Sequence, residues 1–220
     1  MTVLPDREGY LARWSTLHGD FDPHGSRLIS GYLGITYVLA RPFALARVPP
    51  DVLTLGGLLI SALLVLVAAQ GGRWLLLAAV ITAVSGVADN IDGAVAVLTD
   101  RATRFGYVLD SVVDRVSDAL YLVALWVVGA PAALCVVGGV LMLLQEYLRA
   151  RAGNAGMGEI GVVTVWERPT RVTVTAMFLL AGGLFPAYAV EAATAAAAAW
   201  VGLGVVGFTQ LLVVVRRLLR

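Results

Sequence analysis

The chain has 220 residues, of which 59% are hydrophobic and only 14% are charged, and its formal net charge is +1. A soluble globular domain carries about 25% charged residues, so this composition excludes an ordinary soluble domain and indicates an integral membrane protein. The balanced charge gives no reason to expect a nucleic-acid partner. The single cysteine, Cys135, lies in an apolar run and cannot form a disulfide within the chain.

The N-terminal part of the chain differs in composition from the rest. Residues 1–27 are polar, mixed in charge and without the basic-then-apolar order of a cleaved signal peptide. We therefore expect an uncleaved polar segment, followed by a membrane domain over residues 28–220. The run "LISGYLGITYVLARPFALAR" at 28–47 contains Arg41 and ends at Arg47. We interpret it as an amphipathic juxtamembrane helix on the membrane surface, and a transmembrane helix is the alternative that the sequence leaves open.

Six later runs are apolar enough to cross a bilayer core, which takes about 20 helical residues. They cover roughly 52–70, 74–98, 105–128, 131–150, 170–188 and 191–215. We therefore predict an all-α integral membrane protein with six transmembrane helices and an N-terminal juxtamembrane helix. Four tryptophans fall near the span ends and are interpreted as an interfacial aromatic belt: Trp74, Trp126, Trp166 and Trp200.

The arginines are distributed unevenly over the loops of this six-span topology. One side carries only Arg73, whereas the other carries Arg101, Arg104, Arg149, Arg151, Arg168, Arg171, Arg216, Arg217 and Arg220. The positive-inside rule puts the Arg-rich side, with both chain ends, in the cytoplasm, and the protein in the inner (plasma) membrane. The longest polar connection, residues 151–171, lies on this side, and we predict that it is functional.

Five aspartates lie among apolar residues in "DNIDGAVAVLTDRATRFGYVLDSVVD", residues 89–114. Asp89 and Asp92 are three residues apart near the end of the second span, and Asp110 and Asp114 are four apart near the start of the third. Each pair therefore lies on one helix face, and a short turn makes the two helices antiparallel neighbours. Carboxylates inside a membrane are costly and mark function by default. Four at one depth suit a hard divalent cation such as Mg²⁺, Mn²⁺ or Ca²⁺.

Other interpretations of the intramembrane acids remain open at this point. They could pair with arginines, or carry ions in an ion-coupled transporter, although transporter sites typically lie near the bilayer midplane and these acids lie near one face. Asp118 lies one turn beyond Asp114. A role as partner for Arg115 or for another buried donor explains it at least as well as a catalytic role.

The spacing of these residues resembles a motif of the CDP-alcohol phosphotransferases (CDP-alcohol phosphatidyltransferases), D-x2-D-G-x2-A-R-x8-9-G-x3-D-x3-D. Seven of its eight specified positions match with the correct gaps: Asp89, Asp92, Gly93, Ala96, Gly106, Asp110 and Asp114. Val97 stands where the family has Arg. The stretch "PPDVLTLGG" at 49–57 is similar to the family's P-N-x-L-T-x-x-G, with Asp51 in place of Asn and Thr54 at the matching Thr.

The resemblance implies an enzyme of phospholipid synthesis that moves a phosphatidyl group from CDP-diacylglycerol to an alcohol and releases CMP. It implies two divalent ions, Mg²⁺ or Mn²⁺, held by Asp89, Asp92, Asp110 and Asp114. Asp114 would be a metal ligand or the catalytic general base. Thr54, Asp89, Gly93 and Ala96 would line the nucleotide site. The family's architecture also implies a homodimer surrounded by membrane lipids.

The acceptor alcohol is indicated by four arginines that flank the polar loop, namely Arg149, Arg151, Arg168 and Arg171. Guanidinium groups bind phosphate oxygens bidentately, so these residues are candidates for binding a phosphorylated acceptor. An equally good explanation of the four arginines is that they only follow the positive-inside rule. "DRVSD" at 114–118 and the Arg-rich end of the fourth span look like bacterial phosphatidylinositol-phosphate synthases, whose acceptor is inositol phosphate. Glycerol-3-phosphate is the alternative acceptor, and Val97 motivates a further alternative, a CDP-lipid-binding protein without turnover.

Overall fold

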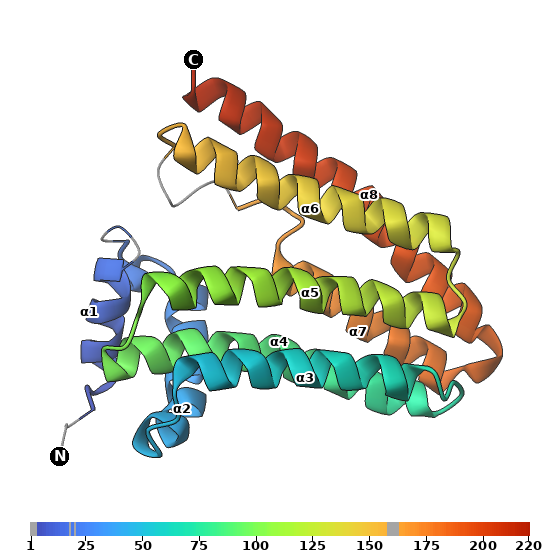
Figure 1. Ribbon diagram of the computed structural model, residues 1–220, viewed down its shortest axis with the longest axis horizontal. Coiled ribbons are helices and arrows are strands. Elements are labelled where there is room, and N and C mark those ends of the chain that lie inside the picture. Colours follow the sequence, from blue (N-terminus) through green and yellow to red (C-terminus); the bar gives the residue numbers. More distant parts are fainter. Residues whose placement is uncertain (1–3, 18, 20, 158–162) are drawn as a thin grey trace. The chain divides into compact units, whose positions relative to one another are not determined.

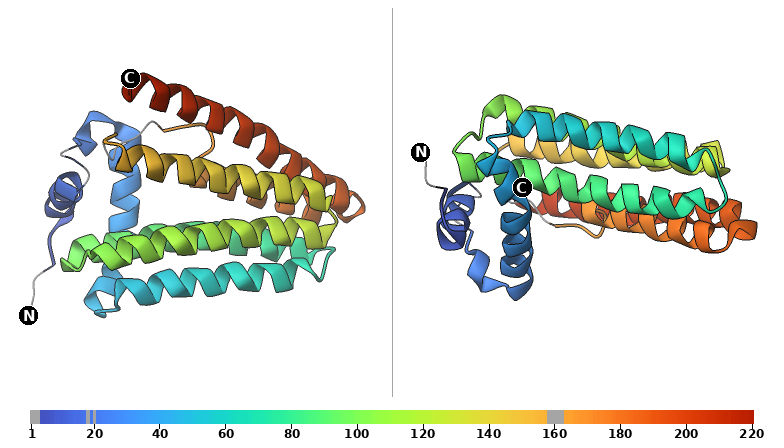
Figure 2. Two further views of the ribbon diagram at one scale, coloured as in Figure 1. Left: turned by 45° about the horizontal axis from the view of Figure 1, so that its top comes forward. Right: turned by 90° about the horizontal axis from the view of Figure 1, so that it is seen from below.

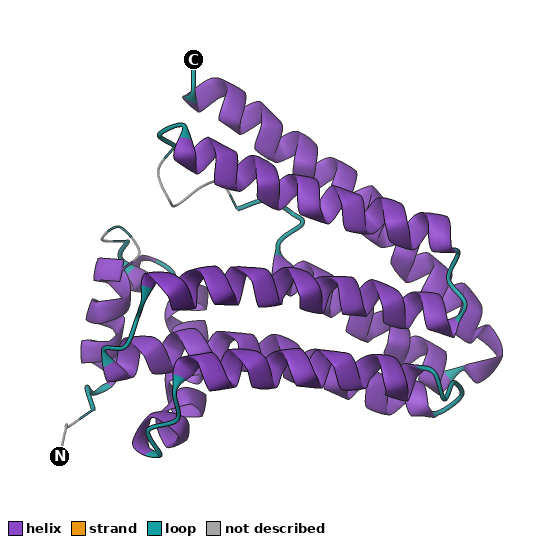
Figure 3. Cartoon of the chain, viewed as in Figure 1, coloured by secondary structure: helices purple, strands orange, loops and turns teal. Residues whose placement is uncertain are grey.

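The computed structural model describes residues 4–17, 19, 21–157 and 163–220, and these residues contain α-helices and short 3-10 turns but no strand (Figures 1 and 3). The predicted all-helical class is therefore confirmed. The helices are α1 (Arg7–Leu17), α2 (Arg27–Leu45), α3 (Pro50–Ala68), α4 (Trp74–Thr99), α5 (Arg104–Val128), α6 (Ala132–Asn154), α7 (Arg168–Leu184) and α8 (Ala189–Leu218).

The six predicted apolar runs correspond to α3–α8, each within a few residues. By length and apolar composition, four described segments are suited to cross a membrane: Pro50–Ala68, Trp74–Thr99, Ala132–Asn154 and Pro186–Leu218. The other two differ for physical reasons, because α5 carries the charged residues of its first half and α7 has only 17 residues. The protein is membrane-embedded, and the count of six spans stays a prediction.

The chain divides into two compact units, one of Met1–Gly57 with Val87–Asp114 and the other of Leu58–Gly86 with Arg115–Arg220. In the first unit, α1 and α2 contact each other, and their apolar residues form a core with the C-terminal half of α4. Tyr10 and Leu11 of α1 are each only 1% exposed in this core, and Val95 and Leu98 of α4 are also buried there.

Helix α1 was not predicted from the sequence, because residues 1–27 have neither an apolar run nor a clear helical periodicity. Asp6 caps its start by accepting a hydrogen bond from Gly9 N, at 2.8 Å. Arg7 NH2 then donates to the backbone oxygen of Ser30 at 3.1 Å, which fastens α1 to α2. The predicted juxtamembrane segment forms α2, which begins after Ser26, whose hydroxyl accepts from Ile29 N.

The second unit is held together by α8, which packs along α6 and α7 (Figures 1 and 2). Trp166 and Trp200 meet edge to face at its centre, with ring centroids 5.1 Å apart, and Trp200 Nε1 donates to Thr175 Oγ1. Both indoles are 0% exposed, so their assignment to an interfacial belt was wrong: they fill the core between helices. Trp74 and Trp126 are exposed, as a belt requires.

Gly207 of α8 allows this close packing. A Cβ added at Gly207 would lie 2.5 Å from Trp166 Cβ, whereas a Cβ at Gly202 of the same helix would have no atom within 4 Å. The atom that this Cβ would meet is the Cβ of a fully buried tryptophan, which cannot move without shifting the backbone and the surrounding core at a cost in free energy.

We predict that Gly207→Ala destabilises the protein by about 1–3 kcal/mol through overpacking. Gly202→Ala is the matched control and should be neutral or stabilising by up to about 1 kcal/mol, because Ala is the better helix former. Thermal unfolding of the two variants in detergent measures the difference. Equal melting temperatures would contradict the packing argument.

Candidate active site

Three of the four motif aspartates converge within the first unit. Each of Asp89, Asp110 and Asp114 offers a carboxylate oxygen, and these three oxygens lie within 4.8 Å of one another. All three residues are half-buried. Like charges at this separation disfavour ionisation of one another, whereas a divalent cation among them would reverse that effect. The donor set, carboxylate oxygens alone, fits a hard cation such as Mg²⁺ or Mn²⁺.

Asp92 is oriented differently from the other three acids. It is only 3% exposed, and its Oδ2 accepts a hydrogen bond from Thr54 Oγ1 at 2.5 Å, while its Oδ1 accepts from Gly93 N at 2.6 Å. Thr54 comes from the "PPDVLTLGG" stretch, so this bond joins the two motif segments. Two of the residues predicted to bind metal or nucleotide, Asp92 and Thr54, therefore hold each other in place.

The motif glycines act in two different ways. Gly93 is exposed, and a Cβ added to it would meet no atom within 4 Å, so it leaves open space beside the acids. A Cβ at Gly106 would lie 3.0 Å from Thr103 Oγ1 and 3.4 Å from Asp51 Oδ1. Gly106 thus lets the start of α5 approach the start of α3. Ala96 is half-buried, one turn beyond Asp92 on α4.

A cavity of about 230 Å³ in the first unit contains the acids Asp89, Asp92 and Asp110. Helices α4 and α5 provide these carboxylates, together with Gly93 and Val97. Helices α1 and α2 provide aromatic side chains to the same cavity: Tyr10, Trp14 and Tyr32. The site therefore combines metal-binding oxygens with aromatic rings.

The two tyrosines of this cavity remain neutral phenols. Burial, with a smaller contribution from the neighbouring Tyr32, raises the pKa of Tyr10 to about 12. Burial also raises the pKa of Tyr32, with an added contribution from the negative charge of Asp89. Neutral phenols can donate hydrogen bonds beside the acids without adding negative charge.

Val97, which departs from the motif, is 7% exposed and lines the cavity. The cation nearest to its backbone comes from α1: Arg13 NH1 donates to the carbonyl oxygens of Val97 and Leu98, each at 3.5 Å. Sequence reasoning missed Tyr10, Arg13, Trp14 and Tyr32, because no motif or spacing relates them to the aspartates. Arg101 and Arg104, the next arginines along the chain after Val97, are exposed.

The predicted acceptor arginines lie in the second unit, where two of them belong to a buried ion network. Arg171 is 0% exposed; its Nε is 3.0 Å from Asp118 Oδ2, and its NH1 donates to the backbone oxygen of Trp166. Arg115 NH2 is 3.6 Å from the same Asp118 oxygen, which confirms the predicted partner of Asp118.

Glu146 of α6 links the arginines of this network. Its Oε1 is 2.5 Å from Arg115 NH1 and 3.6 Å from Arg171 NH2, and its Oε2 is 3.9 Å from Arg149 Nε. Arg149 NH2 also lies 2.7 Å from Glu167 Oε1. These ion pairs join side chains of α5, α6 and α7 and of the residue before α7: Arg115, Asp118, Glu146, Arg149, Glu167 and Arg171.

The other two predicted acceptor residues differ in burial, since Arg151 is exposed and Arg168 is half-buried. Both flank the polar connection predicted to be functional. Residues 158–162 of that connection lie outside the described residues. Its second half is attached to the helices, because Gln145 Nε2 donates to Thr164 Oγ1 and Val165 N donates to Gln210 Oε1.

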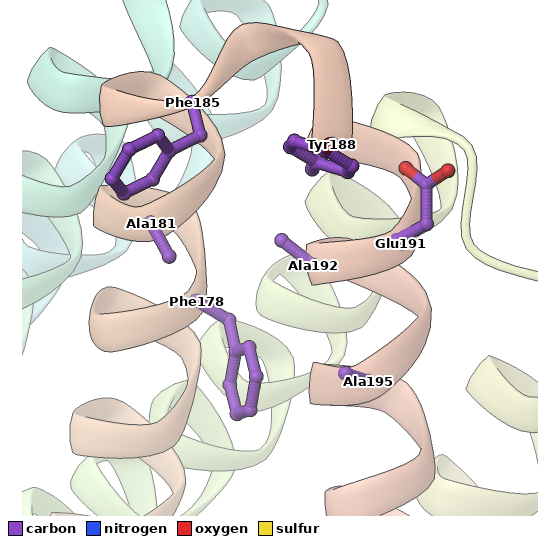
Figure 4. Close-up of a pocket in the computed structure, with 7 residues that line it drawn as sticks. All are labelled: Phe178, Ala181, Phe185, Tyr188, Glu191, Ala192 and Ala195. Atoms are coloured by element: carbon purple, nitrogen blue, oxygen red, sulfur yellow. The ribbon is translucent and has the colours of Figure 1, made fainter.

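A separate apolar cavity of about 400 Å³ lies between α7 and α8. Figure 4 shows Phe178 and Ala181 on α7 facing Ala192 and Ala195 on α8, with Phe185 and Tyr188 near the connecting turn. Glu191 is the one ionisable carboxylate among its lining residues. This cavity suits hydrocarbon and has no cluster of ligands for a metal or a phosphate.

Residues 47–214 match the model of the CDP-alcohol phosphatidyltransferase family. The chain belongs to this family. The match includes the four motif aspartates and Thr54, and it begins after α2. Family membership identifies the protein as a transferase of phospholipid biosynthesis and gives no support to the ion-coupled transporter.

Curated relatives of this phosphatidyltransferase are similar over most of their length. It is 34% identical to the archaetidylinositol phosphate synthase of Methanothermobacter thermautotrophicus over 149 residues, covering 66% of this chain and 73% of the relative. It is 33% identical to the phosphatidylinositol phosphate synthase of Corynebacterium glutamicum over 163 residues, covering 70% and 72%.

The phosphatidyltransferase also resembles a solved structure in its fold. The phosphatidylinositol phosphate synthase of Mycobacterium tuberculosis with CDP-DAG bound is 26% identical, with a TM-score of 0.65, over 82% of this chain and 93% of that one. A structure of the same enzyme in complex with manganese and citrate is 24% identical with a TM-score of 0.66, and shares the fold.

We predict that Asp118→Asn destabilises this phosphatidyltransferase by about 3–5 kcal/mol, because it leaves the buried Arg171 without its closest carboxylate. Asp100→Asn is the matched control; Asp100 is exposed and has a φ of 56°, which Asn tolerates, so stability should change by no more than about 0.5 kcal/mol. Thermal unfolding in detergent compares the two. A melting temperature of Asp118→Asn equal to that of the control would show that the ion network contributes little.

Proposed function

We propose that the protein transfers the phosphatidyl group of CDP-diacylglycerol to an inositol phosphate and releases CMP. The observation that carries the proposal is the convergence of Asp89, Asp110 and Asp114 within 4.8 Å, at the spacing of the family motif. The similarity to phosphatidylinositol phosphate and archaetidylinositol phosphate synthases supports the acceptor. The likeness to a synthase with CDP-DAG bound supports the lipid donor.

The metal in this proposal is Mg²⁺ or Mn²⁺, with two ions held by Asp89, Asp92, Asp110 and Asp114. Three of these carboxylates already share one centre, and Asp92 lies in the same cavity beside Thr54. Divalent cations, when bound, neutralise the diphosphate of the donor and stabilise the charge that develops on the leaving phosphate. Thr54, Gly93 and Ala96 complete the nucleotide site, and Gly93 supplies the space.

The residues of this chain perform the remaining chemistry. Asp114 accepts the proton of the attacking hydroxyl, which forms a bond to the β-phosphorus of the CDP-lipid while the bond to the bridging oxygen breaks and CMP departs. A general base must reach that proton within about 2.6–3.2 Å in the substrate complex. Asp114 is half-buried, and its carboxylate oxygen lies within 4.8 Å of those of Asp89 and Asp110, which supports this role.

The phosphate of the acceptor is assigned to Arg149, Arg151, Arg168 and Arg171. Arg149 and Arg171 are already paired with Glu146, Glu167 and Asp118, so a bound phosphate would share them with these carboxylates. Glycerol-3-phosphate also carries a phosphate group that these arginines could bind. An experiment therefore has to compare it directly with inositol phosphate as the acceptor.

In the proposed setting, α3–α8 cross the inner membrane as six spans and α2 lies on its surface. The Arg-rich loops, both termini and the active site face the cytoplasm, in agreement with the positive-inside rule. We also propose a homodimer, on the resemblance to the family's architecture.

The purified protein should release CMP from CDP-diacylglycerol with inositol phosphate and Mg²⁺, and chelation of divalent ions should abolish the release. Asp89→Asn or Asp110→Asn should reduce kcat/KM by about 100-fold or more, because each removes a charged oxygen ligand. Parallel reactions with glycerol-3-phosphate, serine and no acceptor determine the acceptor. The exposed turn residue Asp100 provides the control variant Asp100→Asn.

Turnover with glycerol-3-phosphate but not with inositol phosphate would replace the proposed acceptor. CMP release that persists in both Asp variants would overturn the assigned centre. If the protein binds the CDP-lipid but releases no CMP with any acceptor, the result would favour the alternative suggested by Val97, a CDP-lipid-binding protein without catalytic activity.

The open space at Gly93 leads to a second prediction. Gly93→Leu should fold at least as well as the unaltered protein, since Leu is a better helix former than Gly by about 1 kcal/mol and the Cβ it adds has no atom within 4 Å. Its side chain would enter the cavity and reduce kcat/KM for the CDP-lipid by about tenfold or more, because misplaced reacting groups are costly. Gly202→Leu is the matched control, and equal kinetics of the two variants would contradict a role for Gly93 in the site.

A further inference from the structure

The cavity that holds the acids has a wall that the family motif does not provide. Residues 47–214 match the family, whereas α1 (Arg7–Leu17) and α2 (Arg27–Leu45) precede them. Trp14 of α1 and Tyr32 and Thr36 of α2 nevertheless line the same cavity as Asp89 and Asp110. The N-terminal helices are therefore part of the site in this chain.

This wall is firmly attached to the first unit. Tyr10 and Leu11 anchor α1 in the core with 1% exposure each, and Arg7 ties α1 to Ser30 of α2. The rings of Tyr10 and Tyr37 lie 5.7 Å apart, which adds a contact between the two helices. The two helices of the wall are thus attached to each other and, through Tyr10 and Leu11, to the core of the first unit.

Tyr32 is the most accessible aromatic residue of the cavity. Its side chain is 48% exposed, and Asp89 lies close enough to influence its phenol electrostatically. Trp14 is half-buried and packs edge to face against Phe21, with ring centroids 6.3 Å apart. Aromatic faces beside a metal-binding acid cluster suit a ligand that carries both a planar base and phosphates.

Arg13 brings a positive charge from α1 to the motif position that lacks its Arg. Its NH1 lies 3.5 Å from the carbonyl oxygens of Val97 and Leu98, so the exposed guanidinium contacts this part of α4. A guanidinium has five N–H donors, and both of these contacts use NH1. Guanidinium donors are of the kind that bind phosphate oxygens bidentately.

We infer that α1 and α2 complete the nucleotide site: the base of the CDP-lipid stacks on Tyr32 and Trp14, and Arg13 provides the charge that Val97 does not. This inference rests on the proposed function, because it assigns the nucleotide of the same donor to the same cavity. It adds residues outside the matched family segment as determinants of donor affinity.

The stacking half of the inference is tested by binding of CMP to the purified full-length protein in Mg²⁺, measured by calorimetry. Tyr32→Ala should weaken the binding of CMP about 5- to 100-fold, the range for loss of one stacked base. Tyr32→Phe should bind nearly as well as the unaltered protein, because stacking needs the ring and not the hydroxyl. Thr16→Ala on the exposed face of α1 is the control, since its hydroxyl donates to the backbone oxygen of Ala12 in its own helix.

The proposed role of the Arg13 charge in binding the donor is tested by steady-state kinetics of Arg13→Ala. The KM for CDP-diacylglycerol should rise by about tenfold while the KM for the acceptor stays unchanged, and Val97→Arg introduced into the Arg13→Ala protein should restore most of the loss. A merely structural role of α1 would lower the melting temperature and would not be rescued at position 97.

The outcomes separate this inference from the proposed function. If the unaltered protein releases CMP from CDP-diacylglycerol but Tyr32→Ala and Arg13→Ala bind CMP and the donor normally, α1 and α2 are not part of the nucleotide site and the proposed function stands. If the unaltered protein neither binds CMP nor releases it, both are overturned.

Discussion

The constraint on which the site depends is the approach of three carboxylates, those of Asp89, Asp110 and Asp114, to within 4.8 Å of one another. Three carboxylates at this distance repel one another, so packing of the surrounding helices has to hold them together. The turn between α4 and α5 does so by closing tightly: Asp100 takes a left-handed φ of 56°, and Arg101 N bonds to Ala96 O at 2.9 Å. Gly106 then lets α5 begin close to Asp51. A divalent cation held by these carboxylates would offset their mutual repulsion.

The second unit uses charge in the opposite way. Its arginines lie against carboxylates, and its most deeply buried members, Asp118 and Arg171, are paired at 3.0 Å. Loss of one partner of such a buried pair is costly, because the other charge is left uncompensated. Asp114 and Asp118 are only one helical turn apart, so their different surroundings follow from their partners and not from spacing. One acid belongs to a group of like charges, and the other to an ion pair.

The sequence predicts the parts of this protein that depend on periodic patterns. The apolar runs correspond to α3–α8, and three of the four motif acids meet as their same-face spacing requires. It does not predict α1, whose stability comes from burial of Tyr10 and Leu11 against α4 rather than from a local pattern. Nor does it distinguish an interfacial tryptophan from Trp166 and Trp200, because position along a helix does not reveal whether a small residue such as Gly207 on a neighbouring helix leaves room for the ring.

The replacement of the motif Arg by Val97 and the packing of α1 against α4 are structurally linked. Val97 is 7% exposed in the apolar core that α1 forms with Val95 and Leu98 of α4. A long charged side chain at this position would have to leave the core for the cavity that Val97 lines, and Arg13 already contacts the backbone of this residue. With valine at position 97, α1 packs closely and delivers its own arginine to the same stretch of backbone. The positive charge then comes from Arg13 of α1. Comparison of the motif along α4 alone shows a missing Arg, whereas the folded unit contains an arginine from another helix at the same place.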